Sequence, residues 1–217
     1  MLAVRGASLA LHAKDFVALM GPSGSGKTTF IGVMTGLDRP DEGEVTWAGR
    51  PIGSLSDDER RTLRRTDMGV VFQSFGLCRR CRPWRTSSCR CGSPACRSPR
   101  RASARAAGSS GSAWPTAPTT GRSSLGRPTA ARVAVARALI AEPTVVLADE
   151  PIAEVDTENA DLILDALWDV IRRGGAVLAA THNPEALRYA NRVVLFHDGV
   201  VQAEGTPEEL AGQLTTD

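Results

Sequence analysis

Short apolar runs alternate with helical patterns along most of the chain. Residues 16–20 form a continuous apolar run, a glycine-rich turn follows, and a helical pattern extends from about residue 27 to residue 35. An uninterrupted apolar run of this length is typical of a strand that is buried on both faces. The first part of the chain therefore predicts a strand, a loop and a helix in that order.

The alternation continues on both sides of an interruption in the middle of the chain. Apolar runs rich in β-branched residues predict further strands at 68–73, 144–150, 176–182 and 192–199. Helical patterns lie at 131–142, 158–172 and 183–190, and a short antiparallel strand pair is expected around Gly49. Strands and helices in this order predict an α/β fold, with a mainly parallel sheet flanked by helices and a small antiparallel β part.

The composition fits a single globular domain over residues 1–217. The chain has 42% hydrophobic and 23% charged residues, and single domains typically hold about 100–200 residues. No apolar run approaches the roughly 20 residues that span a bilayer, and no signal peptide opens the sequence. We therefore expect a cytoplasmic protein.

One stretch, residues 78–131, differs from the rest in composition. It holds 11 of the 26 basic residues, all five cysteines and none of the 24 acidic residues, and Leu125 is its one large aliphatic residue. The remainder of the chain is acidic, so no nucleic acid partner is expected. Because the stretch has so little apolar surface to bury, we expect it to be disordered as written.

Three interpretations of residues 78–131 remain open. The cysteines offer thiolates for zinc, although Cys78-x2-Cys81 with Cys89-x-Cys91 matches no familiar zinc spacing. The arginines suit nucleic acid phosphates. The interpretation that we favour is a shifted reading frame in a GC-rich gene. Permitted codons for residues 84–96, when each codon is begun one nucleotide earlier, allow VENVVLPLRLAGV. Those for residues 126–131, read one nucleotide later, allow GGQQQR.

The octapeptide GPSGSGKT, at residues 21–28, matches the phosphate-binding pattern G-x-x-x-x-G-K-S/T at every position. Its glycines let the backbone curl so that N–H groups face phosphate oxygens, and a helix N-terminus follows. Lys27 supplies charge for the β- and γ-phosphates, and the Thr28 hydroxyl suits Mg²⁺. The alternative is a glycine-rich turn with a surface lysine. The residues expected to bind nucleotide are Gly21, Pro22, Ser23, Gly24, Ser25, Gly26, Lys27, Thr28 and Thr29.

The motif VVLADEP places two adjacent carboxylates, Asp149 and Glu150, at the end of a predicted buried strand. Ligands bind outside the carboxyl ends of strands in open α/β sheets. We expect Asp149 to reach Mg²⁺, directly or through water, and Glu150 to polarise the water that attacks the γ-phosphate. The alternative is that the two acids merely end the strand.

These motifs, in this order, resemble those of the ATP-binding subunits of ABC transporters. The likeness is greatest to the lipoprotein-release and macrolide-export group, and it covers about three quarters of the chain. The segments that carry it are MGPSGSGKTTF, GLDRPDEGEV, VFQSFGL, RVAVARALIAEPTVVLADEP and ATHNPEAL. The resemblance implies the P-loop ATPase core of that family, with ATP and Mg²⁺ as cofactors.

The resemblance also implies roles for three residues that spacing alone does not assign. Gln73 matches the Q-loop glutamine that senses Mg²⁺ and the membrane subunit, Asp156 matches the D-loop aspartate, and His182 matches the switch histidine near the γ-phosphate. The implied partners are a transmembrane permease subunit and a second ATPase subunit, identical or not, in a head-to-tail dimer. The implied location is the cytoplasmic face of the membrane.

The sequence departs from the family pattern in two places. No aromatic residue precedes Lys27 except Phe16, which lies on the predicted strand, so the start looks truncated and adenine stacking is in doubt. The signature LSGGQ and the helical docking subdomain, which the family places between VFQ and RVAVARAL, are absent. We expect two functional parts, 1–77 and 132–217, around the anomalous stretch, and impaired ATP hydrolysis. The alternatives are a regulatory protein that binds nucleotide and a soluble ABC-type ATPase without transport.

Overall fold

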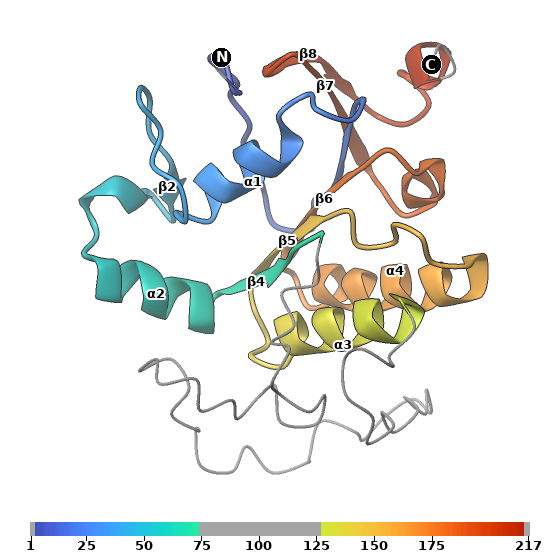
Figure 1. Ribbon diagram of the computed structural model, residues 1–217, viewed down its shortest axis with the longest axis horizontal. Coiled ribbons are helices and arrows are strands. Elements are labelled where there is room, and N and C mark those ends of the chain that lie inside the picture. The colour runs from blue at the N-terminus through green and yellow to red at the C-terminus, as the bar shows by residue number, and fades with distance from the viewer. Residues whose placement is uncertain (1–2, 74–126, 215–217) are drawn as a thin grey trace.

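The protein forms a six-stranded, mainly parallel sheet with helices on both faces (Figure 1). The computed structural model describes residues 3–73 and 127–214. The strand order is β4-β5-β6-β1-β7-β8, and every neighbouring pair is parallel except the last, β7 and β8. The strands are β1 (Phe16–Met20), β4 (Met68–Val71), β5 (Val145–Asp149), β6 (Ala176–Thr181), β7 (Arg192–His197) and β8 (Val200–Gly205).

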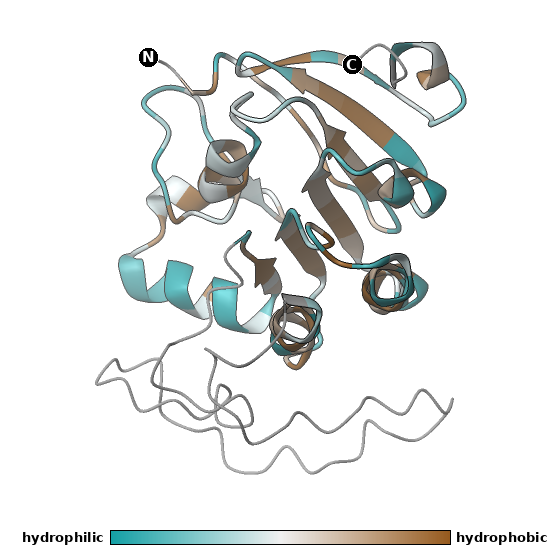
Figure 2. Ribbon diagram, turned by 45° about the vertical axis from the view of Figure 1, so that its right-hand side comes forward, coloured by the Kyte–Doolittle hydropathy of each residue, from teal (hydrophilic) through white to brown (hydrophobic). Residues whose placement is uncertain are grey.

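Side chains of the central strands pack into three hydrophobic clusters, and the two largest involve helices α1 (Lys27–Met34), α3 (Arg127–Leu139) and α4 (Thr157–Arg172). On β1, Phe16 belongs to the core formed with α3 and α4, whereas Val17 belongs to the core formed with α1. Figure 2 shows apolar strands between these helix layers. Strands covered on both faces must be apolar at every position, which explains the uninterrupted runs in the sequence.

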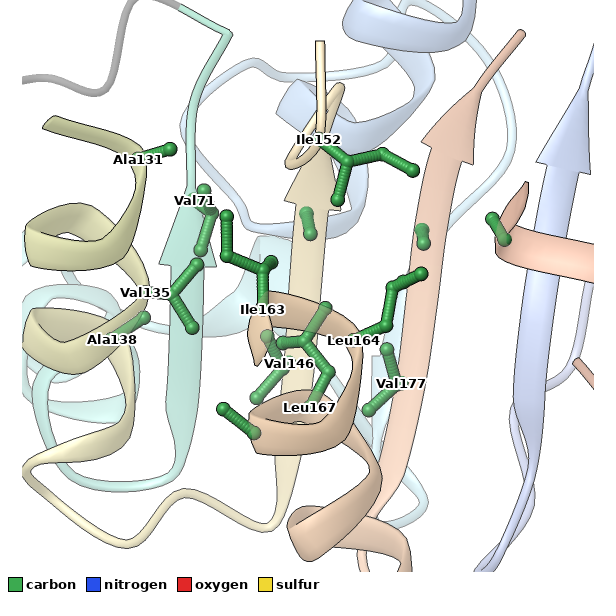
Figure 3. Close-up of a cluster of buried hydrophobic side chains, with 14 of the residues drawn as sticks. Val71, Ala131, Val135, Ala138, Val146, Ile152, Ile163, Leu164, Leu167 and Val177 are labelled. Carbon is green, nitrogen blue, oxygen red and sulfur yellow. The ribbon is translucent and has the colours of Figure 1, made fainter. Parts of the chain in front are cut away.

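The larger core joins the two described parts of the chain. Figure 3 shows Val71 of β4 beside Val135 of α3, with Val146 of β5 and Ile163 of α4 next to them. All four side chains are fully buried or nearly so. Because β4 precedes residue 74 and α3 follows residue 126, the two parts fold around one common interior.

Smaller elements lie outside the six-stranded sheet. The antiparallel pair of β2 (Thr46–Trp47) and β3 (Arg50–Pro51) turns at Gly49, where φ is 79°. The remaining elements are η1 (Ile52–Ser54), α2 (Asp57–Thr66), η5 (Pro184–Arg188) and α5 (Ala211–Leu214). No helix within 3–73 or 127–214 is long and apolar enough to cross a membrane.

The structure confirms the predicted fold class and adjusts several boundaries. Strand β4 ends at Val71, two residues before the predicted end, and Gln73 lies in the following turn. Helix α3 begins at Arg127, so its first turns, with the buried Ala130 and Ala131, occupy the end of the stretch that was set apart at 78–131. The rest of that stretch, including its cysteines and its expected disorder, lies outside the described residues.

Candidate functional site

The phosphate-binding loop runs from the end of β1 to the start of α1 and passes close to two other segments. A Cβ atom on Gly21 would lie 1.9 Å from the carbonyl oxygen of Phe196 in β7. A Cβ atom on Gly26 would lie 2.1 Å from the carbonyl oxygen of Ala3. Both distances are far below van der Waals contact, so the fold requires glycine at these two positions of the motif.

The loop presents backbone N–H groups that the rest of the described chain does not use. The amides of Ser23, Gly24 and Gly26 donate no hydrogen bond to any described residue, and the N-terminus of α1 adds its first unpaired amides. Concave sets of free amides at a helix N-terminus bind phosphate oxygens. The loop therefore fits the triphosphate that the sequence predicts.

Lys27 lies at the mouth of this loop with its side chain largely buried. Its Nζ atom donates hydrogen bonds to the carbonyl oxygens of Gly21, at 2.6 Å, and Pro22, at 2.9 Å. Burial lowers the pKa of Lys27, and the nearby charges of Glu150 and Asp149 oppose that shift. The ammonium thus stands between the phosphate-binding amides and the two carboxylates.

Asp149 ends β5 next to the first turn of α1. The Thr28 hydroxyl donates a hydrogen bond of 2.8 Å to Asp149 Oδ2, whereas the buried Oδ1 atom has no hydrogen-bond partner among the described residues. Burial raises the pKa of Asp149, against the opposing effects of the Thr28 hydrogen bond and the Lys27 charge. A carboxylate oxygen without a partner beside a hydroxyl is a hard oxygen pair that suits Mg²⁺.

Glu150 follows directly in a left-handed backbone conformation. Its φ angle is 48°, in the left-handed region, and its amide donates to the carbonyl oxygen of Ala180 on β6. The carboxylate contacts the next turn through Oε1, which lies 2.7 Å from His182 Nδ1, and through Oε2, which accepts from the Thr181 hydroxyl at 3.1 Å. The structure therefore joins Glu150 and His182, as their proposed roles require.

Asp156 and Gln73 do not contact this group of residues. Asp156 is the N-cap of α4, where its carboxylate accepts a hydrogen bond of 3.0 Å from the Asn159 amide, and this bond lowers the pKa of Asp156. Gln73 is exposed in the turn after β4, at the carboxyl edge of the sheet, and forms no hydrogen bond with another described residue of the site. Their assigned roles remain predictions from the resemblance.

Ser25 and Phe16 are buried, whereas five of the nucleotide contacts predicted in the loop are exposed. Ser25 is buried, and its hydroxyl has no hydrogen-bond partner among the described residues. Phe16 is fully buried, with its ring centroid 5.9 Å from that of Trp168, so it is not available to stack on a base. Among the loop residues predicted to bind nucleotide, the exposed ones are Pro22, Ser23, Gly24, Thr28 and Thr29.

Sequence reasoning missed Thr181. The residue precedes His182 and ends β6, but the contact of its hydroxyl with Glu150 joins residues 31 positions apart. Because β5 and β6 are parallel neighbours, with Asp149 paired to Ala180, both strands end at the same edge. The signal in the sequence was a hydroxyl residue at the end of a predicted strand beside the candidate switch histidine.

Comparisons with known proteins agree with this geometry. A family profile described as "ABC transporter" matches residues 4–153. Among curated proteins, the chain is 34% identical over 213 residues to the macrolide export ATP-binding/permease protein MacB of Bdellovibrio bacteriovorus, covering 98% of this chain and 32% of that protein. It is 37% identical over 203 residues to the lipoprotein-releasing system ATP-binding protein LolD of Paramagnetospirillum magneticum, covering 91% of this chain and 88% of that protein.

A solved structure shares both fold and sequence features. It is the dimeric ATP-binding cassette MJ0796 in a post-hydrolysis state bound to ADP and Pi, with a TM-score of 0.79, 28% sequence identity, and coverage of 94% of this chain and 90% of that one. The chain spans about a third of the length of the MacB relatives and most of the length of LolD. The chain therefore belongs to the family of ABC transporter ATP-binding proteins, in the group that includes the macrolide-export and lipoprotein-release ATPases.

Proposed function

We propose that the chain binds ATP with Mg²⁺, hydrolyses it, and thereby drives the permease of an ABC transporter. The observation that carries the proposal is the meeting of the phosphate-binding loop with the end of β5. There the Thr28 hydroxyl is bonded to Asp149, and the second oxygen of Asp149 is buried without a partner. A buried carboxylate oxygen without a partner favours a bound cation, and a magnesium-bound triphosphate supplies one.

Each residue of the site has a distinct part in the proposed reaction. The loop amides and Lys27 bind the phosphate oxygens, and Thr28 and Asp149 would hold Mg²⁺, which offsets phosphate charge. Glu150 orients a water molecule toward the γ-phosphorus and accepts its proton as the new P–O bond forms and the bond to ADP breaks. His182, hydrogen bonded to Glu150, is proposed to contact the γ-phosphate.

The proposed partners follow from the relatives. MJ0796 is described as dimeric, and MacB is an ATP-binding/permease protein in which a chain like this one makes up about a third of the length. We propose that two ATP-binding chains, identical or not, bind two nucleotides between them and move a permease at the cytoplasmic face of a membrane. ATP then favours the closed dimer, and hydrolysis restores the open one.

Hydrolysis is proposed to be slow in a chain of this sequence. LSGGQ does not occur in the sequence, so the group that would meet the γ-phosphate from the second subunit is missing. If its contribution resembles that of an arginine finger, the rate falls on the order of 10³-fold or more. This absence favours a second candidate function, that of a regulatory protein that binds nucleotide without turnover.

The test measures binding and turnover on the same purified chain. We expect a fluorescent ATP analogue to bind with Mg²⁺ and to be displaced by ATP, and radiolabelled ATP to be hydrolysed slowly. Lys27→Ala should abolish binding, whereas Lys14→Ala, which alters the one other lysine of the sequence, should not. Binding without any turnover favours the regulatory candidate, and failure of the folded chain to bind ATP at millimolar Mg²⁺ contradicts both.

A further inference from the structure

The carboxylate of Glu150 is held at both of its oxygens by the turn that follows β6. Oε2 accepts a hydrogen bond of 3.1 Å from Thr181, whose side chain is fully buried, and Oε1 lies 2.7 Å from Nδ1 of His182, whose side chain is 69% exposed. One oxygen therefore contacts a fully buried side chain and the other contacts a mostly exposed one. The two oxygens are not equivalent.

The direction of the Thr181 hydrogen bond is fixed by a third residue. The Asn183 amide donates a hydrogen bond of 3.0 Å to Thr181 Oγ1. Because an N–H group only donates, the hydroxyl oxygen acts as acceptor there, and its own proton is left for Glu150. An ionised carboxylate only accepts, so the chain of donors runs from Asn183 through Thr181 to Glu150 Oε2.

The backbone leaves Thr181 and Glu150 little freedom to separate. Thr181 ends β6 in register with Met20 of the neighbouring strand β1. The Glu150 amide is bonded at 2.8 Å to Ala180, the residue before Thr181. Branching at Cβ restricts the χ1 angle of threonine. Both the backbone and the side chain of Glu150 are thus anchored to the end of β6.

We propose that Thr181 is a positioning residue that sets the rotamer of Glu150 for ATP hydrolysis, an inference that rests on the proposed function. By holding Oε2, it leaves Oε1 as the oxygen beside the mostly exposed His182. When the water oxygen bonds to the γ-phosphorus, its proton passes to Oε1 and the bond to ADP breaks. Thr181 itself touches neither nucleotide nor water.

The test compares three variants of the full chain by steady-state hydrolysis. Thr181→Val keeps the shape and removes the hydroxyl, whereas Thr181→Ser keeps the hydroxyl. Thr35→Val is the matched control, because Thr35 is also buried and its hydroxyl donates to a backbone carbonyl, that of Gly32 at the other end of α1. We expect Thr181→Val to lower kcat by about 10- to 100-fold, the effect of one hydrogen bond to a charged group, with KM for ATP unchanged.

Thr181→Ser and Thr35→Val distinguish a positioning role of the Thr181 hydroxyl from a general effect of losing a buried hydroxyl. Thr181→Ser should recover most of the lost kcat, and Thr35→Val should keep the wild-type kcat. A Thr181→Val protein with wild-type kcat overturns the inference. So does an equal loss of kcat in Thr35→Val, because loss of any buried hydroxyl would then suffice.

A second measurement decides the inference even if the wild-type chain shows no turnover, which would count against the proposed function alone. Crystal structures of the wild type and both Thr181 variants show the Glu150 rotamer directly. We expect the contact of Glu150 Oε1 with His182 Nδ1 in the wild type and in Thr181→Ser, and a rotated carboxylate in Thr181→Val. An unchanged Glu150 rotamer in Thr181→Val contradicts the inference.

Discussion

At the scale of single residues, burial disfavours the charged forms of Lys27 and Asp149, which the proposed function needs. It lowers the pKa of Lys27 and raises that of Asp149, and in both cases burial is the largest cause. Lys27 is compensated by two carbonyl oxygens, whereas one oxygen of Asp149 has no partner among the described residues. The site thus favours a ligand that brings a cation to Asp149, and the same imbalance makes the stability of the chain depend on pH.

Asp149→Asn tests this imbalance through stability. The folded-state pKa of Asp149 lies above its unfolded value of about 3.9, so the folded chain binds the proton more tightly. Relative to Asp149→Asn, the wild type is therefore most stable below about pH 4 and loses stability as the pH rises through the raised pKa. Each unit between the two pKa values corresponds to about 1.4 kcal/mol. Urea unfolding from pH 4 to pH 8 measures the difference.

A control at an exposed carboxylate isolates the effect of burial. Asp41 is exposed in the segment before β2, and Asp41→Asn, which removes one carboxylate outside the site, is measured under the same conditions. ATP with Mg²⁺ should raise the midpoint of the wild type and of Asp41→Asn but not that of Asp149→Asn. A pH-independent difference between the wild type and Asp149→Asn would show that the Asp149 proton is not linked to folding.

At the scale of elements, the buried strands and the amphipathic α4 were predicted from the sequence, and the polar helix α2 was not. Its sequence, DDERRTLRRT, has one large apolar residue and so shows no apolar stripe. It is stabilised instead by a capping box, in which Ser56 and Glu59 each accept from the other's backbone amide. Arg64 also donates to the carbonyl oxygens of Thr35 and Gly36 at the end of α1.

The candidate site, like the fold, was predicted only where its residues form local patterns. The phosphate-binding loop and the acids at the end of β5 are such patterns, and their meeting follows from the parallel order of strands. The contact of Thr181 with Glu150 depends on which strands are neighbours and on the left-handed backbone at Glu150. Neither is encoded in a local pattern, so sequence reasoning gave His182 a role and overlooked the residue before it.

Ser56→Ala tests whether α2 depends on its cap. Loss of an N-cap side chain costs about 1 kcal/mol, so we expect the free energy of unfolding to fall by that amount. ATP affinity should not change, because the capping box lies in α2, away from the described contacts of the loop. Ser8→Ala, at an exposed position outside any helix or strand, is the control. Equal stability of the two variants in urea would mean that contacts other than the cap, such as the hydrogen bonds of Arg64, hold α2.

At the scale of the whole molecule, the site is shared between the two described parts of the chain. Lys27 and Thr28 come from the first part, and Asp149 and Glu150 from the second, joined by the core that Val71 and Val135 share. The nucleotide-binding half of the proposed machine is therefore present in a chain without LSGGQ. Under the proposed function, that absence would remove the contribution of a second subunit.

Restoring the missing signature tests that conclusion on the intact molecule. The variant replaces residues 84–96 with VENVVLPLRLAGV, residues 124–125 with Leu-Ser and residues 126–131 with GGQQQR, so that LSGGQ is uninterrupted. We expect kcat for ATP to rise on the order of 10³-fold, while the affinity of one chain for the ATP analogue stays the same, because the phosphate-binding loop and Asp149 are unchanged. The restored chain should also dimerise with ATP when Glu150→Gln blocks hydrolysis, which sedimentation detects, and the original sequence carrying Glu150→Gln should remain monomeric. Equal kcat in the original and restored chains would mean that residues outside LSGGQ complete the site, and that residues 78–131 are no obstacle to hydrolysis.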